Sequence, residues 1–281
     1  MRGRGFAVAW CIAVLPLAGC GGATDAPGDR GNIGDSGDRE SSAPSSLPEE
    51  LTGTLAVFAA ASLTEVFTEF ESKLEAQHPS LDVVLVFGGS SALAQQLLAG
   101  APADVFAAAD ETTMQTAVDG AVVQTPVAFA RNLLALAVPP NNPGGVTGLD
   151  DLARPELLIA LCASEVPCGR AADRLLLKQG ITPSVDTREQ DVRSVLTKIE
   201  LGEVDAGLIY ATDARVATDR VTTDRVTLVP IAGADAVATT ASISVVVGTS
   251  QPAAAAAFVA LVTSAEGARV LSAAGFTGVN E

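Results

Sequence analysis

Residues 54–77 read TLAVFAAASLTEVFTEFESKLEAQ, and this stretch decides the fold class. Its first part, from Leu55 to Phe58, is apolar in the manner of a strand and then dissolves into three alanines and Ser62. Its second part carries apolar residues at the i, i+3, i+4, i+7 spacing of one helix face, namely Leu63, Val66, Phe67, Phe70 and Leu74. The pattern predicts a strand that passes through a small-residue turn into an amphipathic helix.

The same alternation continues along the chain. Short apolar runs predict further strands at 81–89, 104–110, 133–140, 157–163, 205–211 and 243–248. Amphipathic or alanine-rich segments predict helices at 91–100, 169–179, 191–201 and 252–265. Strands that alternate with helices of about ten residues indicate an α/β fold with a parallel or mixed sheet and helices on its faces.

The N-terminal residues indicate the compartment. A basic start with Arg2 and Arg4 precedes an apolar run from Phe6 to Ala18, which is too short to span a membrane and has the length of a signal-peptide core. The sequence Leu-Ala-Gly-Cys that ends at Cys20 resembles the lipobox of bacterial lipoproteins. The resemblance implies that 1–19 is a signal peptide and that Cys20 becomes the lipidated first residue. An ordinary cleaved signal is the alternative.

Residues 20–50 are rich in Gly, Ser, Pro and acidic residues and have almost no large apolar side chain. Such a segment cannot bury enough surface to offset the entropy lost on ordering, so we expect a flexible tether. The formal charge of the whole chain is −16, which argues against binding to nucleic acid or to anionic lipid surfaces. Attraction for an anion would have to come from local dipoles.

The chain has four cysteines. Cys11 leaves with the signal and Cys20 takes the lipid, so Cys162 and Cys168 remain as a pair in an oxidising compartment. This predicts a disulfide between them. A redox or metal-binding pair is the alternative, but the Cys-x5-Cys spacing matches neither a redox dithiol nor a zinc knuckle, and His78 is the only histidine.

Hydroxyl and small residues recur where predicted strands become helices. Ser62 has Glu65 three residues later, which is the capping-box spacing, so one interpretation is that Ser62 only caps its own helix. The construction repeats at Ser90-Ser91, at Pro167-Cys168-Gly169 and at Asp191-Val192. In an open α/β sheet such turns gather beyond the carboxyl ends of the strands, and helix starts offer unpaired N–H groups and a favourable dipole. With no lysine or arginine at the two serine turns, they predict a cage of neutral donors for an oxyanion.

The chain lacks the usual signals of an enzyme, and we expect none. It has no GxxxxGK phosphate loop, no histidine at the serine turns of Ser62 and Ser90, and no carboxylate pair that stands out. Tyr210, the sole tyrosine, ends a predicted strand. It is either a core residue with its hydroxyl at the rim or a site residue, and a single tyrosine argues against a ferric-ion trap that needs a pair.

Four segments together resemble the molybdate-binding proteins of bacterial ABC uptake systems: VFAAASLTE, FGGSSALAQQLLAGAPADVFAAAD, VPCGRAA and DVRSVLTKIELGEVDAGLIYATDA. The resemblance runs in order from residue 54 to the C-terminus. It implies an α/β type II periplasmic-binding-protein fold, with two α/β lobes joined by crossing strands. We expect the first lobe at 51–131 plus 240–281 and the second lobe at 132–239.

The resemblance also implies a set of oxyanion-binding residues. Ser62 and Ser90 would each donate a hydroxyl and a backbone N–H, Cys168 and Val192 a backbone N–H, and Tyr210 its phenol. Cys168 stands where the family usually has a small apolar residue, but a backbone donor does not depend on the side chain. A disulfide to Cys162 would also prevent a thiolate from repelling the anion.

Ligand chemistry narrows the choice of anion. Molybdate offers only acceptors, so every contact must be a donor, whereas hydrogen phosphate also needs an acceptor in the site. Asp191 is the one candidate acceptor, and we expect its carboxylate to turn away from the anion. Sulfate has the charge and shape of molybdate but is smaller.

These observations predict a monomeric, extracytoplasmic receptor, anchored to the cell membrane through Cys20. It would bind molybdate or tungstate without a cofactor and hand the ion to an ABC permease driven by its ATPase. The alternatives are a sulfate or phosphate receptor of the same fold and an exported thiol-redox protein that uses Cys162 and Cys168.

Overall fold

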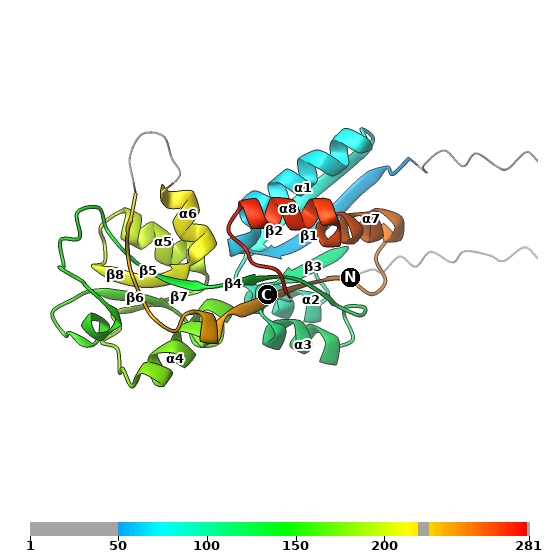
Figure 1. The fold of residues 1–281 in the computed structure, drawn as a ribbon. Helices are drawn as coiled ribbons and strands as arrows, with labels where there is room; N and C mark the ends of the chain where they lie inside the picture. Colours follow the sequence, from blue (N-terminus) through cyan, green and yellow to red (C-terminus); the bar gives the residue numbers. More distant parts are fainter. Residues whose placement is uncertain (1–49, 219–224, 280–281) are drawn as a thin grey trace, which may run out of the picture. The chain divides into compact units, whose positions relative to one another are not determined.

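The computed structural model describes residues 50–218 and 225–279. The expected signal peptide, Cys20 and the tether up to residue 49 lie outside the described residues. The described chain forms two α/β lobes, each built on a five-stranded mixed sheet with interleaved helices (Figure 1). This confirms the predicted fold class.

The sheet of the first lobe has the strand order β2-β1-β3-β10-β4. Its strands are β1 (Gly53–Ala60), β2 (Leu81–Gly88), β3 (Val105–Ala108), β4 (Val127–Asn132) and β10 (Thr239–Val245). The first three run parallel, and β10 lies antiparallel to both β3 and β4. The helices of this lobe are α1 (Thr64–Gln77), α2 (Ser90–Leu98), α3 (Glu111–Asp119), α7 (Pro252–Thr263) and α8 (Ala265–Ala273).

Alternating side chains of β1 divide the core of this lobe between two faces. Leu55, Val57 and Ala59 pack with apolar residues of α1, α7 and α8, whereas Phe58 packs with those of α2 and α3. The two groups of helices accordingly cover opposite faces of the sheet (Figure 1). Within the described residues no single helix is long and apolar enough to cross a bilayer, and one bent pair, α7 with α8 at 60°, meets the length and composition criteria jointly.

The sheet of the second lobe has the order β7-β6-β8-β5-β9. Its strands are β5 (Leu134–Val138), β6 (Ile159–Cys162), β7 (Thr187–Glu189), β8 (Ala206–Tyr210) and β9 (Thr227–Val229). Its helices are α4 (Pro167–Gln179), α5 (Val192–Glu200) and α6 (Ala211–Thr218). The described residues also contain three short 3-10 turns, η1 (Ala61–Leu63), η2 (Leu149–Ala153) and η3 (Asp235–Val237). β6 pairs in parallel with β7 and β8, and β5 is antiparallel to β8 and β9.

Two connections join the lobes. The chain leaves the first sheet at Asn132, the end of β4, and enters the second sheet at Leu134, the start of β5; it returns through η3 into β10. Beside the first connection, Asn132 Nδ2 donates to Thr212 Oγ1 over 2.8 Å. The predicted lobe boundaries, after residues 131 and 239, fall at these connections and stay a prediction.

The parallel register determines which turns meet. Ala60 at the end of β1 pairs with Gly88 at the end of β2, and Ala59 pairs with Ala107 of β3. In the second lobe, Cys162 at the end of β6 pairs with Glu189 at the end of β7. The segments that follow these strands therefore leave each sheet at one common edge, where the helices α2, α4 and α5 begin.

Candidate functional site

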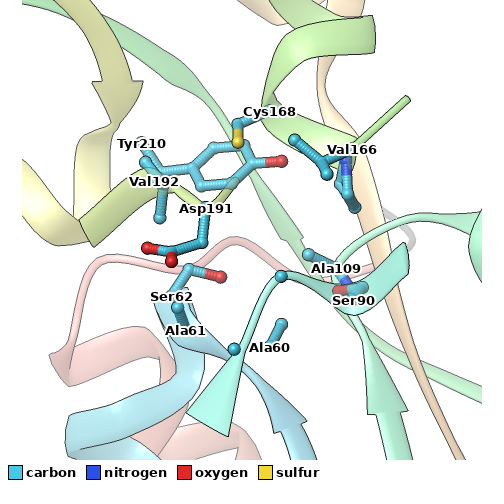
Figure 2. A pocket seen from close by; sticks show the side chains of 13 residues that line it. Ala60, Ala61, Ser62, Ser90, Ala109, Val166, Cys168, Asp191, Val192 and Tyr210 are labelled. Atoms are coloured by element: carbon cyan, nitrogen blue, oxygen red, sulfur yellow. The ribbon is translucent and has the colours of Figure 1, made fainter. Parts of the chain in front are cut away.

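A small cavity lies where the strand-end turns of the two lobes come together (Figure 2). Its volume is about 20 Å³. All five residues predicted as ligand donors line it: Ser62 and Ser90 from the first lobe, and Cys168, Val192 and Tyr210 from the second. The sequence prediction therefore named residues that the fold brings together around one space.

Ser62 does not cap α1. It lies in the 3-10 turn η1, the residue before α1 is Leu63, and no side chain caps this helix start. The capping-box interpretation is therefore wrong for this serine. Glu65, its proposed capping partner, instead contacts Arg193 of the second lobe. Ser62 is buried, and within the described part of the chain its hydroxyl makes no hydrogen bond, so it can donate into the cavity.

Ser90 is the first residue of α2 and is also buried. Its Oγ accepts a hydrogen bond from Ala109 N over 3.1 Å, which leaves the hydroxyl proton for another acceptor. Its own N–H belongs to the first turn of the helix and has no partner within the helix. The preceding Gly89 is required by close packing, because a Cβ there would come 2.2 Å from Gln190 O of the second lobe.

Cys168 is presented to the cavity by the start of α4. The helix begins with Pro167, which has no N–H, and Arg170 N makes the bond to Val166 O over 3.0 Å. The N–H of Cys168 therefore lies in the first turn without a helical partner. Its side chain forms a disulfide with Cys162, with the two Cα atoms 5.7 Å apart.

Val192 opens α5, and Asp191 caps that helix. Asp191 Oδ1 accepts from Ser194 N over 2.9 Å, and Oδ2 accepts from Ser194 Oγ over 3.1 Å. Both carboxylate oxygens thus have donors on their own helix, and Figure 2 shows the carboxylate pointing away from the space between Tyr210 and Ser90. The N–H of Val192 remains as a first-turn donor at the cavity wall.

Tyr210 ends β8 and is 1% exposed. Its phenol oxygen is buried and has no hydrogen-bond partner among the described residues. Burial raises the pKa of this phenol well above its usual value. The group is therefore a neutral donor, and leaving it unpaired costs about 1–3 kcal/mol. Figure 2 shows its hydroxyl directed into the space between the two lobes.

An arginine of the second lobe forms hydrogen bonds with residues of the first lobe near the cavity. Arg170 donates from Nε to Asp110 Oδ2 over 2.8 Å, and from Nη2 to Asp110 Oδ1 over 3.0 Å and to Thr113 Oγ1 over 2.6 Å. Asp110 also caps α3 through Thr113 N. Nearby, Ser91 Oγ donates across the lobes to Glu165 O over 2.6 Å.

A second arginine bridges the lobes through α5. Arg193 pairs with Glu65 of α1 and, through Nε, with Asp213 Oδ1 over 2.5 Å. Asp213 is completely buried, and burial raises the pKa of its carboxyl to about 7, although the Arg193 charge lowers it. Both bridging arginines are thus matched by carboxylates, and no Lys, Arg or His among the described residues lines the cavity.

Sequence reasoning missed these two arginines. A signal was present, because Arg170 follows Cys168 by two residues and Arg193 directly follows Val192, so each lies in the first turn of a donor helix. Nothing in the sequence indicates their partners, however.

In the described part of the chain, no cluster of three or more His, Cys, Asp or Glu side chains could hold a metal ion.

Comparison with known proteins places this geometry in a family context. The model of one family, described as bacterial extracellular solute-binding protein, matches residues 55–277. Among curated proteins, the molybdate-binding protein ModA of Mycobacterium tuberculosis (strain ATCC 25618 / H37Rv) is 40% identical over 241 residues, which cover 84% of this chain and 90% of the relative.

Two solved structures show the same fold at lower identity. The periplasmic molybdate-binding protein of Azotobacter vinelandii has a TM-score of 0.66 and 19% identity, covering 79% of this chain and 98% of that one. The sulfate-binding protein SubI from M. tuberculosis H37Rv has a TM-score of 0.68 and 19% identity, covering 81% of this chain and 87% of that one. At this identity, the likeness shows the fold alone.

Proposed function

The chain belongs to the family of bacterial extracellular solute-binding proteins, and we propose that it is the molybdate receptor of an ABC importer. The observation that carries the proposal is the buried phenol of Tyr210, which has no partner among the described residues and faces a cavity that Ser62 also lines. An oxyanion in this cavity would satisfy both donors. The mycobacterial relative, which this chain matches over most of its length, is a molybdate-binding protein by name.

The donor set selects the protonation state of the ligand. Ser62, Ser90 and Tyr210 offer hydroxyl protons, and Cys168 and Val192 offer N–H groups. Among the described residues that line the cavity, Asp191 is the only carboxylate, and Ser194 engages both of its oxygens. A fully deprotonated tetrahedral dianion needs only donors, whereas hydrogen phosphate also needs an acceptor for its own proton. The site therefore favours molybdate, tungstate or sulfate over phosphate.

The size of the cavity favours a small inorganic ion. The cavity has a volume of about 20 Å³. A sugar or a peptide does not fit in this arrangement of the lobes. The choice between sulfate and the larger molybdate and tungstate ions then depends on how closely the lobes approach each other.

Uptake would use the two-lobed construction. We expect the units 51–131 plus 240–281 and 132–239 to move about the two connections, with the anion favouring the form in which both lobes contact it. In the full scheme, residues 1–19 direct export, lipidated Cys20 anchors the protein outside the cytoplasm, and residues 20–50 tether it. A monomeric receptor then delivers molybdate or tungstate to the permease and its ATPase.

The test is calorimetric titration of the mature chain at neutral pH with molybdate, tungstate, sulfate and phosphate. We expect molybdate and tungstate to bind at least about tenfold more tightly than sulfate, a difference of ~1.4 kcal/mol, and phosphate to bind least. Sulfate binding as tight as molybdate would instead identify a sulfate receptor. Absence of binding by all four anions would refute an oxyanion receptor.

A further inference from the structure

We propose that the Cys162–Cys168 disulfide is a positioning element of the anion site, which holds the Cys168 N–H at the cavity wall and keeps a cysteine thiolate out of it. The inference rests on the proposed function, since it assigns a role within that site. The disulfide joins the end of strand β6 directly to the start of helix α4, and this helix start supplies the Cys168 N–H.

The disulfide closes a short and well-anchored loop. Cys162 is the last residue of β6, Cys168 is the second residue of α4, and residues 163–167 lie between them. The loop backbone is fixed to β7 by the bond from Ala163 N to Glu189 O, 2.8 Å, and closes on itself through Val166 N and Ala163 O, 3.0 Å. Both cysteines are buried, Cys162 at 1% and Cys168 at 4% exposure.

The start of α4 packs directly on the backbone of this loop. At Gly169, next to Cys168, a Cβ atom would come within 1.9 Å of Ala163 O and 2.8 Å of Cys162 O. The backbone of the helix start therefore packs closely on the backbone of the loop, and the disulfide links the two covalently. Cutting the link gives the first turn of α4 more freedom, and an oxyanion must then order that turn when it binds.

The disulfide also determines whether residue 168 can carry a negative charge at the wall of the cavity. Cys168 and Tyr210 both line the cavity, and Figure 2 shows the Cys168 sulfur among the side chains drawn there. A free thiol ionises near pH ~8.5, and a position at a helix start lowers that value. A thiolate there would repel a dianion, whereas a disulfide sulfur carries no charge. Positioning and charge exclusion are thus separate contributions, and different variants isolate them.

Two variants test the two contributions by titration with molybdate. In Cys162→Ser/Cys168→Ser the loop is open and no thiol remains, so we expect binding about tenfold weaker than in the oxidised wild type, with the same pH dependence as the wild type between about pH 6 and pH 9. In Cys162→Ser a lone Cys168 thiol remains, so affinity should match the double variant near pH ~6 and fall further near pH ~9. Val262→Ala, a core change in α7 remote from the cavity, lowers overall stability and should leave affinity unchanged.

Hydrogen exchange of the segment 163–170 gives a readout that needs no anion. We expect faster exchange in the double variant than in Val262→Ala, compared at equal distance from their unfolding midpoints. Equal exchange would overturn the positioning role whether or not an anion binds. If molybdate binds wild type and double variant alike, the inference fails and the proposed function stands. If the oxidised wild type binds none of the four anions, the proposed function fails, and exchange alone decides the positioning role.

Discussion

Replacing Arg170 by methionine should weaken oxyanion binding although Arg170 does not line the cavity. Its guanidinium makes a two-pronged contact with Asp110 and a further bond to Thr113, and all three bonds cross from the second lobe to the first. They exist only when the lobes are together. Removing them therefore destabilises the form that would hold the anion and leaves the open form unchanged.

The expected loss of binding free energy can be estimated from the burial of the Arg170 and Asp110 side chains. The Asp110 side chain is 6% exposed and that of Arg170 is 22% exposed, so the pair lies between a surface pair and a buried one. Hydrogen bonds to charged groups contribute about 1.5–3 kcal/mol, and exposed pairs contribute about 0–1 kcal/mol. We take ~2 kcal/mol for the whole contact, which corresponds to a roughly thirtyfold rise in Kd when the ligand-free chain is mostly open.

The assay is calorimetric titration with molybdate together with stopped-flow measurement of release. We expect the loss mainly in a faster dissociation rate. Arg174→Met is the matched control, because Arg174 lies on the same helix, is exposed, and makes none of the contacts across the lobes. The affinity of Arg170→Lys for molybdate should lie between those of wild type and Arg170→Met, since lysine keeps the positive charge but cannot make the two-pronged contact of a guanidinium. If Arg170→Met and Arg174→Met bind molybdate equally, the reasoning is refuted.

Three further changes probe the donors and the buried acid. Ser62→Ala should weaken molybdate binding by about 1–3 kcal/mol, whereas Ser72→Ala, exposed on α1, should not; equal affinities would remove Ser62 from the site. Tyr210→Phe should stabilise the ligand-free protein, since it deletes an unpaired buried hydroxyl, and weaken anion binding; urea unfolding and titration on the same samples check both signs. Burial raises the folded pKa of Asp213 from 3.8 to about 7, so the folded state holds this proton more tightly. The stability gained from this proton is fully present below pH 3.8 and is lost as the pH rises to about 7. The free energy of unfolding of wild type relative to Asp213→Asn should therefore fall across that range by up to ~1.4 kcal/mol per pH unit. If the difference in unfolding free energy between the two proteins does not change with pH, the burial argument is contradicted.

The first strand and helix show what the sequence could predict. The strand and helix expected within 54–77 correspond to β1 and α1, because one is continuously apolar and the other has a clear helical stripe. β10 was harder. It was expected at 243–248 from its valines but spans Thr239–Val245, because the buried segment TTAS pairs with β4 and owes its strand state to that neighbour. β4 and α3 were missed since each has few buried apolar residues.

The donors were predictable for a different reason from the bridges. Ser62, Ser90, Cys168 and Val192 each follow the end of a strand, and a parallel register brings such turns to one edge, so local sequence was sufficient to place these residues together. Their roles as donors were implied by the family resemblance and stay a prediction. The Arg170–Asp110 pair joins residues 60 positions apart on different lobes. Its formation depends on how the lobes meet, and that information is not contained in either segment.

The most direct measurement is a crystal structure of the mature protein with tungstate, in which anomalous scattering locates the metal atom. We expect one peak between the lobes, with oxyanion oxygens within hydrogen-bond distance of Ser62 Oγ, Ser90 Oγ and Tyr210 Oη and no lysine or arginine side chain in contact. A peak elsewhere, or one held by cationic side chains, would contradict it.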